Sequence, residues 1–231
     1  MRVVAINSSP KMDNGNTSLI LNPFLEGMKE TGAEIELFYT KNLKINPCQG
    51  DFSCSLKNPG ICFQKDDMQM LHPKLFEADI WVFASPLYIS GFNGPMKVLI
   101  DRILTPVGEP YIGVKDGRCH HPIRENIKRG KLVLVSSCGY WEIENFDLLI
   151  AHMKEFSFHS EWEFVGALLR PHAPALKPMI RSGAPIYDIF EAAKKAGHQL
   201  IMDGKMSSET LSIVSRELLP MKEWVRGNTA N

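Results

Sequence analysis

The chain has 231 residues, 44% of them hydrophobic and 23% charged, which is the composition of an ordinary globular protein. Lysine plus arginine and aspartate plus glutamate both number 26, so the formal net charge is zero. A neutral chain lacks the basic surface that binds nucleic acid or an anionic membrane, and we expect neither partner. Neutrality also favours an enzyme over a small acidic electron carrier.

The first residues, Met1–Ile6, run directly into an apolar strand pattern without the features of a signal peptide. No segment approaches the length of a membrane span. We therefore expect a cytoplasmic protein, whose five cysteines are thiols or metal ligands and not disulfides. Because no internal repeat or low-complexity linker divides the sequence, we predict a single domain over residues 1–231.

Short apolar runs alternate with segments of helical period, which indicates βαβ units on a parallel sheet. The five predicted strands are Val3–Asn7, Glu34–Tyr39, Asp79–Ser85, Lys131–Ser137 and Trp162–Leu169. Most are continuously apolar, as strands covered on both faces are. The second strand alternates between apolar and charged residues, so we place it at an edge of the sheet.

Helical periodicity fills the segments between and after these strands. One apolar face is formed by Met96, Leu99, Ile100, Ile103 and Leu104, and another by Phe146, Leu149, Ile150 and Met153. Two C-terminal helices, within about residues 186–225, are predicted at Tyr187–Asp203 and Glu209–Trp224, with Gly204 ending the first. Pro23 is expected to kink or delay the first helix.

This order predicts an α/β fold of the flavodoxin-like, doubly wound type, with a five-stranded parallel sheet in the order 2-1-3-4-5 and extra C-terminal helices. In such sheets the ligand lies beyond the carboxyl ends of the strands, where the strand order reverses. Glycine-rich or polar loops should therefore follow the first, third and fourth strands.

The loop after the first strand predicts an anion site. Backbone N–H groups and the positive end of the following helix attract a phosphate. Side-chain donors come from Ser9, Asn16, Thr17 and Ser18, and Lys11 adds a positive charge. The loop has neither the Walker pattern nor the dinucleotide glycine pattern, so a phosphate monoester such as that of FMN fits best. The alternative is an Asn-Gly turn that caps a helix.

The loops after the third and fourth strands are also rich in small residues. The third-strand loop contains Pro86, Leu87, Tyr88, Ile89, Ser90 and Gly91, whose fixed backbone can face the edge of a flat ring. The fourth-strand loop supplies Ser137 and Gly139. The alternatives for Tyr88 are packing on the ring and packing on the protein, and the second is the usual one for a tyrosine. Three loops that converge on one crevice make a stronger prediction than any one of them.

These segments resemble the NADPH-dependent FMN reductase superfamily. The similarity lies in Ser9–Lys11, in Gly15–Ser18, and in Ser85–Tyr88 followed by Met96–Arg102, and it covers most of residues 1–140. The resemblance implies FMN on these loops and a homodimer or homotetramer. It also implies that the flavin carries the chemistry, so we assign no catalytic side chain.

A cysteine loop at about residues 47–63 resembles the iron-sulfur flavoprotein branch of this superfamily. Its pattern, C-x2-D-x2-C-x7-C, is formed by Cys48, Asp51, Cys54 and Cys62. Asp51 stands where that branch has a second cysteine for its iron-sulfur cluster. Either the aspartate completes a cluster, or the cluster is lost and the segment is a loop or an interface. The second alternative follows from the fact that thiolate is the normal ligand of iron.

Some reactive residues receive no catalytic role. Cys119-His120-His121 lies in a glycine- and proline-rich stretch, 106–122, which we interpret as a solvated loop, a contact to the substrate or a flap over the flavin. Adjacent ligands are weak evidence for zinc, even with His172 as a further ligand. Cys138 is expected to be a small buried residue, and Asp101-Arg102 to fix packing or a dimer contact.

The expected function is that of an FMN-dependent NAD(P)H oxidoreductase. A nicotinamide would reduce the flavin, which would then pass electrons to a quinone, a metal ion, oxygen, free flavin or a redox protein. An alternative is an iron-sulfur flavoprotein-type electron carrier reduced by ferredoxin. A third is a non-catalytic FMN protein that uses the cysteine loop for assembly.

Overall fold

The central sheet of the protein has five parallel strands in the order β2-β1-β3-β7-β8, and a short strand, β4, pairs antiparallel with β3. A computed structural model describes the backbone of residues 1–228 and their side chains except those of 104–107. The strands are β1 (Arg2–Asn7), β2 (Glu34–Tyr39), β3 (Ile80–Tyr88), β4 (Gly91–Phe92), β7 (Lys131–Ser137) and β8 (Glu163–Arg170). The predicted 2-1-3-4-5 order of a flavodoxin-like sheet is confirmed, with β2 at one edge.

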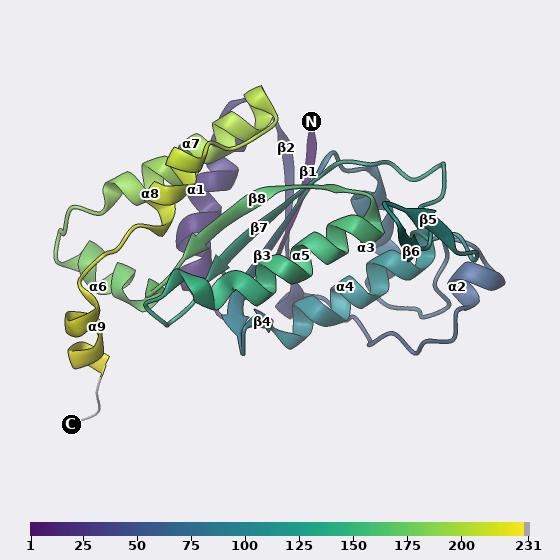
Figure 1. Cartoon of the computed structure of the whole chain (residues 1–231), viewed down its shortest axis with the longest axis horizontal. Coiled ribbons are helices and arrows are strands. Elements are labelled where there is room, and N and C mark those ends of the chain that lie inside the picture. The colour runs from purple at the N-terminus through teal and green to yellow at the C-terminus, as the bar shows by residue number, and fades with distance from the viewer. Residues whose placement is uncertain (229–231) are drawn as a thin grey trace.

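Helices lie between most of these strands in the sequence and follow the last of them (Figure 1). They are α1 (Asn16–Glu30), α2 (Ser53–Leu56), α3 (Met68–Glu77), α4 (Gly94–Val107), α5 (Asp147–Ser160), α6 (Leu176–Arg181), α7 (Tyr187–Asp203), α8 (Ser208–Ser215) and α9 (Met221–Asn228). Short 3-10 turns lie at Met12–Asn14, Thr40–Asn42, Ile143–Phe146 and Ala173–Ala175. A separate hairpin consists of β5 (Gly113–Lys115) and β6 (Arg118–His120).

Alternate residues of the buried strands point into two different cores, because side chains along a strand point to opposite faces. In β1, Val3 and Ala5 join the core under α1 and α7, whereas Val4 and Ile6 join the core under α3, α4 and α5. Figure 1 shows these two helix layers on either side of the sheet. Both faces of the central strands are therefore covered, which explains their continuous apolar sequences.

The α1–α7 contact depends on two glycines. A Cβ at Gly27 would lie 2.0 Å from the Lys194 carbonyl oxygen, and a Cβ at Gly197 would lie 2.1 Å from the Phe24 carbonyl oxygen. The helix backbones therefore touch at these points. Pro23 lies within α1 and does not end it, and α7 ends at Gly204 in the left-handed conformation, as predicted.

The prediction of one helix over Glu209–Trp224 is wrong. The chain forms α8 and α9 with an extended segment between them, in which Arg216 leaves the helical conformation. Pro220 would clash with the carbonyl of residue 216 inside a continuous helix. Leu104 of the predicted α4 face lies outside the described side chains. None of the helices among residues 1–228 is both long and apolar enough to span a bilayer.

Candidate functional site

The loop after β1 is held by the buried side chain of Asn7. Its Oδ1 accepts a hydrogen bond from the Ser9 N–H at 2.9 Å, and its Nδ2 donates to the Ser18 hydroxyl at 2.9 Å. That hydroxyl donates onward to the Met12 carbonyl at 2.7 Å. Gly15 lies so close to the Ser9 side chain that a Cβ at Gly15 would be 2.4 Å from the Ser9 Oγ. Its own side chains therefore fix this loop before any ligand binds.

The N-terminus of α1 emerges from this loop without a side-chain cap. Gly15 occupies the N-cap position, no side chain accepts a cap hydrogen bond there, and the first turn has no acidic residue. The Thr17 and Ser137 hydroxyls lie 2.8 Å apart, which joins this turn to the end of β7. Uncapped N–H groups at a helix N-terminus favour an anion.

Two buried hydrogen bonds fix the loop after β3 against its neighbours. The Asn93 Nδ2 donates to the Ser8 carbonyl at 2.7 Å, which ties this loop to the loop after β1. The Ser136 hydroxyl donates to the Ser85 carbonyl at 2.7 Å, which ties it to β7. The carboxyl ends of the three central strands are thus connected by neutral side chains.

The β3–β4 turn is strained at its tip. Ile89 and Ser90 both have positive φ values, of 45° and 60°, and the Ile89 side chain is fully exposed. A β-branched residue in the left-handed region is a genuine outlier, and such strain is concentrated at functional sites. The turn stands beside Tyr88, at the rim of the cleft described below.

A fourth loop, which follows β8, completes the site. The Cys138 N–H donates to the Arg170 carbonyl at 3.1 Å, and the Ala173 N–H donates to the Cys138 carbonyl at 2.9 Å. The His172 N–H donates to the Tyr140 carbonyl at 2.6 Å. These backbone bonds join the β7 and β8 loops into one wall.

The four loops enclose a cleft of about 190 Å³ at the carboxyl ends of the strands. Its lining is formed by Ser9, Pro10, Lys11, Gly15, Asn16, Thr17, Pro86, Leu87, Tyr88, Ser137, Cys138, Gly139, Ala173 and Pro174. Nine of the thirteen residues predicted to bind the cofactor are among them. Sequence reasoning missed Ala173 and Pro174, although the same rule about carboxyl ends applies to the loop after the fifth strand.

Four predicted cofactor residues lie elsewhere. Ser18 is fully buried: its hydroxyl accepts a hydrogen bond from the Asn7 amide and donates one to the Met12 carbonyl. Ile89, Ser90 and Gly91 belong to the β3–β4 hairpin and do not line the cleft. The cleft therefore uses the strand end before this turn and not the turn itself.

Lys11 is the charged residue that lines the cleft. The other titratable groups in the lining are Tyr88 and Cys138, and burial raises the pKa of the Cys138 thiol, which favours its neutral form. Hydroxyl groups of Ser9, Thr17 and Ser137, the Lys11 ammonium and the N-terminus of α1 together form a donor set for a phosphate monoester. An FMN phosphate fits this donor set.

A buried arginine behind the fourth loop holds the C-terminal segment. Arg170 donates to the carbonyls of Val214 at 2.7 Å and Arg216 at 2.6 Å, at the end of α8. Burial lowers the pKa of Arg170 to about 10. His172 accepts a bond from the Leu218 N–H at 2.9 Å, and burial together with Arg170 lowers its pKa to about 4. The loop after β8, which forms part of the wall of the cleft, is therefore held by hydrogen bonds to the C-terminal segment.

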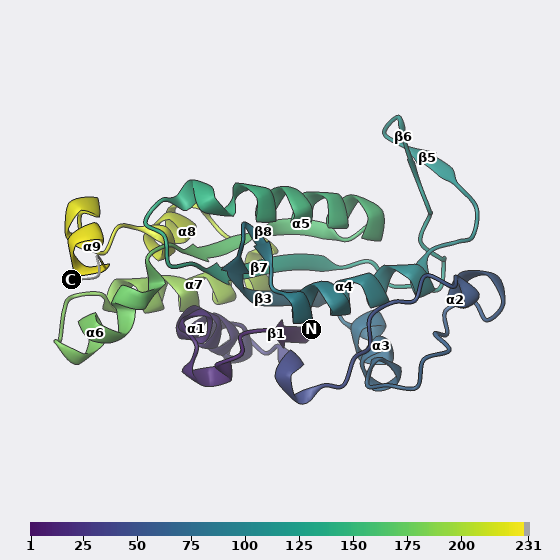
Figure 2. The ribbon, with the colours of Figure 1, turned by 90° about the horizontal axis from the view of Figure 1, so that it is seen from below.

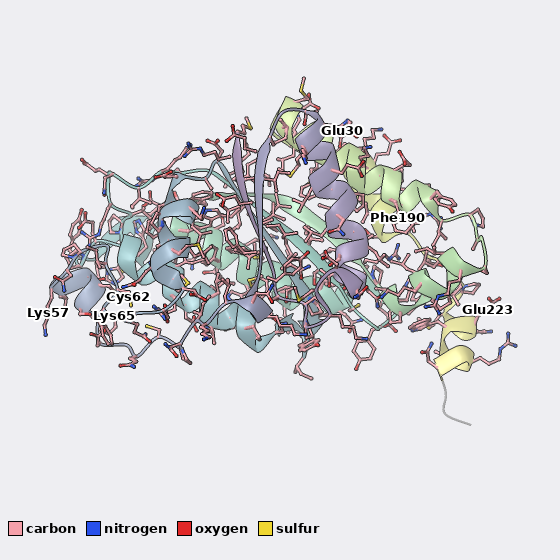
Figure 3. All side chains as sticks on the ribbon, turned by 180° about the vertical axis from the view of Figure 1, so that it is seen from behind. Glu30, Lys57, Cys62, Lys65, Phe190 and Glu223 are labelled. Carbon is pink, nitrogen blue, oxygen red and sulfur yellow. The ribbon has the colours of Figure 1, made fainter. Side chains whose placement is uncertain are left out.

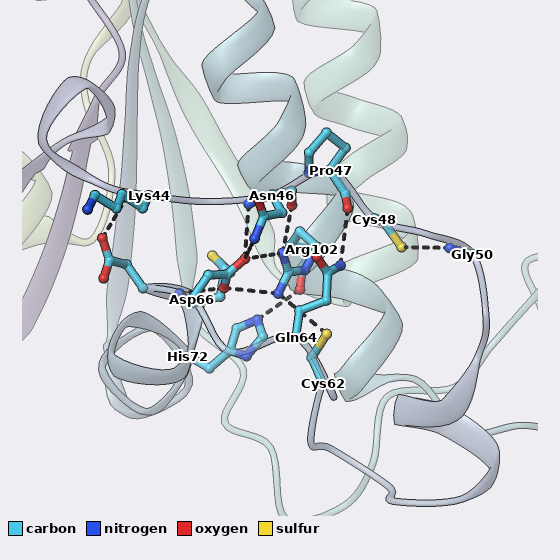
Figure 4. A network of polar contacts seen from close by, with 12 residues as sticks. Lys44, Asn46, Pro47, Cys48, Gly50, Cys62, Gln64, Asp66, His72 and Arg102 are labelled. Carbon is cyan, nitrogen blue, oxygen red and sulfur yellow. Dashed lines mark hydrogen bonds and ion pairs between the residues drawn. The ribbon is translucent and has the colours of Figure 1, made fainter.

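The cysteine segment lies over the C-terminal half of α4, where Arg102 is buried (Figure 4). Arg102 forms a two-point ion pair with Asp66, at 2.7 and 3.2 Å, and donates to the Cys62 sulfur at 3.4 Å. Burial disfavours the Asp66 carboxylate, but hydrogen bonds from Arg102, Asn46 and Met68 outweigh it and lower the pKa of Asp66. The expectation that Arg102 fixes packing fits this pair.

The four residues of the proposed cluster motif do not form a metal site. Cys48, Asp51, Cys54 and Cys62 line a space of only about 10 Å³ together with Arg102. Among the residues with described side chains, no three His, Cys, Asp or Glu side chains are placed to hold a metal. This donor set does not fit an iron-sulfur cluster.

The Cys119–His121 segment forms part of the β5–β6 hairpin and does not line the cleft. His120 lies 3.4 Å from Glu161, and His121 donates from Nδ1 to the carbonyls of Glu109 and Tyr111. The hairpin follows the C-terminal end of α4, whereas the cleft lies at its start, about 20 Å away along the helix. The hairpin therefore does not lie over the cleft that is predicted to bind the flavin.

The sequence is similar to curated relatives named iron-sulfur flavoprotein. One from Archaeoglobus fulgidus is 33% identical over 139 residues, 60% of this chain and 56% of the relative. Another, from Methanocaldococcus jannaschii, is 35% identical over 102 residues, 44% of this chain and 51% of the relative. The chain thus spans about half the length of the curated relatives it matches.

Solved structures share the fold. An NAD(P)H:quinone oxidoreductase from Methanothermobacter marburgensis superposes with a TM-score of 0.61 at 17% identity, over 87% of this chain and 96% of the other. An FMN-dependent NADH-azoreductase from Bacillus anthracis, in complex with FMN, gives 0.59 at 13% identity, over 87% and 99%. The profile of the NADPH-dependent FMN reductase family matches residues 1–163. These residues contain three of the four loops of the cleft, and the chain belongs to the NADPH-dependent FMN reductase family.

Proposed function

We propose that the protein is an FMN-dependent NAD(P)H oxidoreductase. The observation that carries the proposal is the cleft at the uncapped N-terminus of α1, where Ser9, Thr17 and Lys11 supply donors for a phosphate. Bound FMN would accept hydride from a nicotinamide and pass electrons to a second acceptor. That acceptor is a quinone, a metal ion, oxygen or free flavin.

The protein's part in this reaction is to bind and orient. Ser9, Asn16 and Thr17 would hold the phosphate, and the Pro86–Tyr88 strand end and Gly139 would flank the ring. Burial favours the neutral form of the Cys138 thiol, so Lys11 is the charged side chain of the lining. The lining therefore does not contain two ionisable groups that would act as an acid-base pair. We therefore assign no catalytic acid or base to the side chains that line it.

Three further proposals concern the setting of the reaction. The resemblance to FMN reductases supports a homodimer or homotetramer, and the five unpaired cysteines support a cytoplasmic location. The formal charge of zero supports small molecules or redox proteins as partners in preference to nucleic acid.

The experiment is an anaerobic titration of the protein with FMN and with riboflavin, followed by reduction with NADH or NADPH. We expect about one FMN per chain, binding at least about tenfold tighter than riboflavin because the phosphate adds charge-assisted hydrogen bonds. Reduction of the bound flavin by a nicotinamide, with ping-pong kinetics, supports the proposal. Equal affinity for both flavins would contradict the phosphate site, and a flavin that neither nicotinamide reduces would contradict the reductase.

The alternative of a ferredoxin-reduced electron carrier is supported by the names of the relatives and by the cysteine segment. The small space that the four motif residues enclose does not favour this alternative. Iron and acid-labile sulfide, measured after anaerobic purification, distinguish the two. Stoichiometric iron and sulfide would support the electron carrier, and values near zero would support the reductase.

A further inference from the structure

Two lysines that do not line the cleft bind the loop after β1, residues 9–18, which we call the phosphate loop. The Lys41 ammonium, in the turn that follows β2, donates to the Pro10 carbonyl at 3.2 Å. The Lys177 ammonium, on α6, donates to the Asn14 carbonyl. Figure 2 shows α6 on one side of α1 and the chain that follows β2 on the other. Two segments far apart in the sequence therefore hold the same loop from two sides.

The charges of these two lysines are not balanced by a carboxylate. Other lysines of the chain form ion pairs with acidic residues: Lys74, Lys97, Lys128, Lys131 and Lys194. Within the described side chains, no ion pair involves Lys11, Lys41 or Lys177. Asp13, the acidic residue of the phosphate loop, accepts its hydrogen bond from the neutral Tyr39 phenol. Three ammonium groups therefore surround a loop that contains one carboxylate.

The bond from Lys41 also orients a backbone donor of the phosphate loop. In a planar trans peptide unit the carbonyl and the following N–H point in opposite directions. Lys41 binds the carbonyl of the Pro10–Lys11 unit, and on the opposite side of this unit the Lys11 N–H is directed at the Ser9 hydroxyl, 3.4 Å away. Ser9 lines the cleft. The lysine therefore holds this peptide unit with its N–H group on the side of a cleft residue.

Both ammonium groups lie close behind the lining of the cleft. Pro10, whose carbonyl binds Lys41, lines the cleft itself, and Asn14, whose carbonyl binds Lys177, directly precedes Gly15 of the lining. One hydrogen bond and about one peptide unit thus separate each charge from the lining. This separation is shorter than the Debye length, which is about 10 Å in 0.1 M salt, so a phosphate in the cleft would feel both charges.

The contribution of Lys177 comes from a part of the chain outside the family match, which ends at residue 163. Its helix, α6, directly follows the turn at Ala173–Ala175 that borders the cleft. Residues after β8 therefore supply a charge to the phosphate loop, besides the wall formed by Ala173 and Pro174.

We propose that Lys41 and Lys177 are positioning residues for the phosphate of FMN. The proposal rests on the proposed function. Each ammonium acts through the carbonyl that it binds: it fixes the phosphate loop, and it adds positive charge behind a phosphate monoester, which carries a charge of about −1.5 to −2 at pH 7. Lys11 lines the cleft and is placed to contact the phosphate, whereas Lys41 and Lys177 increase the attraction from behind the loop.

The test compares the dissociation constants of FMN and riboflavin for the full chain, from the quenching of flavin fluorescence at low and high salt. The variants are Lys41→Met, Lys177→Met, the double variant, and Lys177→Arg, which keeps the charge and a donor. The control, Lys29→Met, makes the same change in net charge at an exposed position in the last turn of α1. This position is roughly 20 Å along the helix from the phosphate loop. Figure 3 labels the neighbouring Glu30 at that end of α1.

We expect each methionine variant to raise the dissociation constant of FMN about three- to fivefold, and the double variant more than about tenfold, as for exposed charge pairs. The dissociation constant of riboflavin should change less than about twofold. Lys177→Arg and Lys29→Met should bind FMN as the wild type does. High salt should reduce the preference for FMN more in the wild type than in the double variant, because salt screens the added charges.

Circular dichroism on the same samples verifies that each variant is folded. Equal losses of affinity for FMN and riboflavin would show that the lysines act only on the shape of the loop, and would overturn the proposal. An unchanged affinity of the double variant for FMN would also overturn it. In both cases a wild type that prefers FMN would leave the proposed function standing, whereas a wild type without this preference would contradict the phosphate site itself.

Discussion

The two ends of α4 are stabilised by different chemistry. Near its start, neutral side chains such as Asn7 and Asn93 connect the loops of the cleft, and the first turn of α1 contains no acidic residue. Near its end, Arg102 and Asp66 neutralise each other in a buried ion pair, and the surface beside them is apolar. The first arrangement leaves a net attraction for an anion. The second leaves none.

The largest expected effect comes from breaking the ion pair. Asp66→Asn leaves the Arg102 guanidinium buried beside Cys62 without its counter-charge. We expect the free energy of unfolding to fall by about 3–5 kcal/mol, measured by urea denaturation. The control is Asp188→Asn, which breaks the exposed pair with Arg216 and should cost less than about 1 kcal/mol. Equal losses in the two variants would show that burial of the Arg102 pair has no special weight.

The next effect is a dependence of folding stability on pH, which comes from His172 in the loop after β8. The folded pKa of His172 is about 4 and its ordinary value is 6.5, so between these values the unfolded chain binds a proton that the folded chain does not. Stability therefore falls as the pH drops below about 6.5, by about 2 kcal/mol between pH 7 and pH 5 from this residue.

His172→Asn isolates this contribution. Burial also lowers the pKa of His72 and His152, so the wild-type protein has other groups with the same sign of dependence. Urea denaturation at pH 7 and pH 5 should give a smaller difference for His172→Asn than for the wild type. An identical difference would mean that His172 titrates normally in the folded protein.

A smaller effect is expected for ligand binding at the neutral end. Thr17→Val removes a hydroxyl that lines the cleft and contacts Ser137. We expect the dissociation constant of FMN to rise about tenfold and that of riboflavin to change much less. Thr31→Val, at the far end of α1, loses only hydrogen bonds to carbonyls of its own helix and serves as the control. A parallel loss for riboflavin would place Thr17 away from the phosphate.

The smallest expected effect concerns the strained turn. Ile89→Gly relieves a positive φ at a fully exposed position, and we expect it to stabilise the protein by up to about 1 kcal/mol in urea denaturation. Ile143→Gly, at a partly exposed position without a positive φ, should destabilise it. Destabilisation by Ile89→Gly would show that the Ile89 side chain is held by contacts that outweigh the strain.

The strand order and most of the cleft were predictable because both follow from local patterns. Continuous apolar runs identify central strands, and polar loops after Asn7, Ser85 and Ser137 follow from the chain order. The inward turn of Ser18 was not predictable, because it depends on a side-chain bond from Asn7 across eleven residues. The fourth loop depends likewise on backbone bonds between separate strands.

The far end of α4 was less predictable. The sequence shows a missing cysteine at Asp51, but not that Arg102 reaches Cys62 from a helix forty residues later. Likewise, the Asp116-Gly117 turn of the β5–β6 hairpin has a clear local signal, with φ values of 51° and 73°. Its anchoring on Phe158 does not, because that contact joins segments far apart in the chain. Local chemistry identified these segments, and tertiary contacts decided their roles.

The bonds from Arg170 to the end of α8 have a consequence for the order of events during synthesis. A chain that has left the ribosome only as far as α7 already contains every residue that lines the cleft. It still lacks the carbonyls of Val214 and Arg216 that receive the Arg170 guanidinium. A buried cation without acceptors is unfavourable, so we expect the wall formed by Cys138 and Ala173 to form only after α8 has been translated. On the proposed function, flavin loading then follows translation of a segment that does not line the cleft.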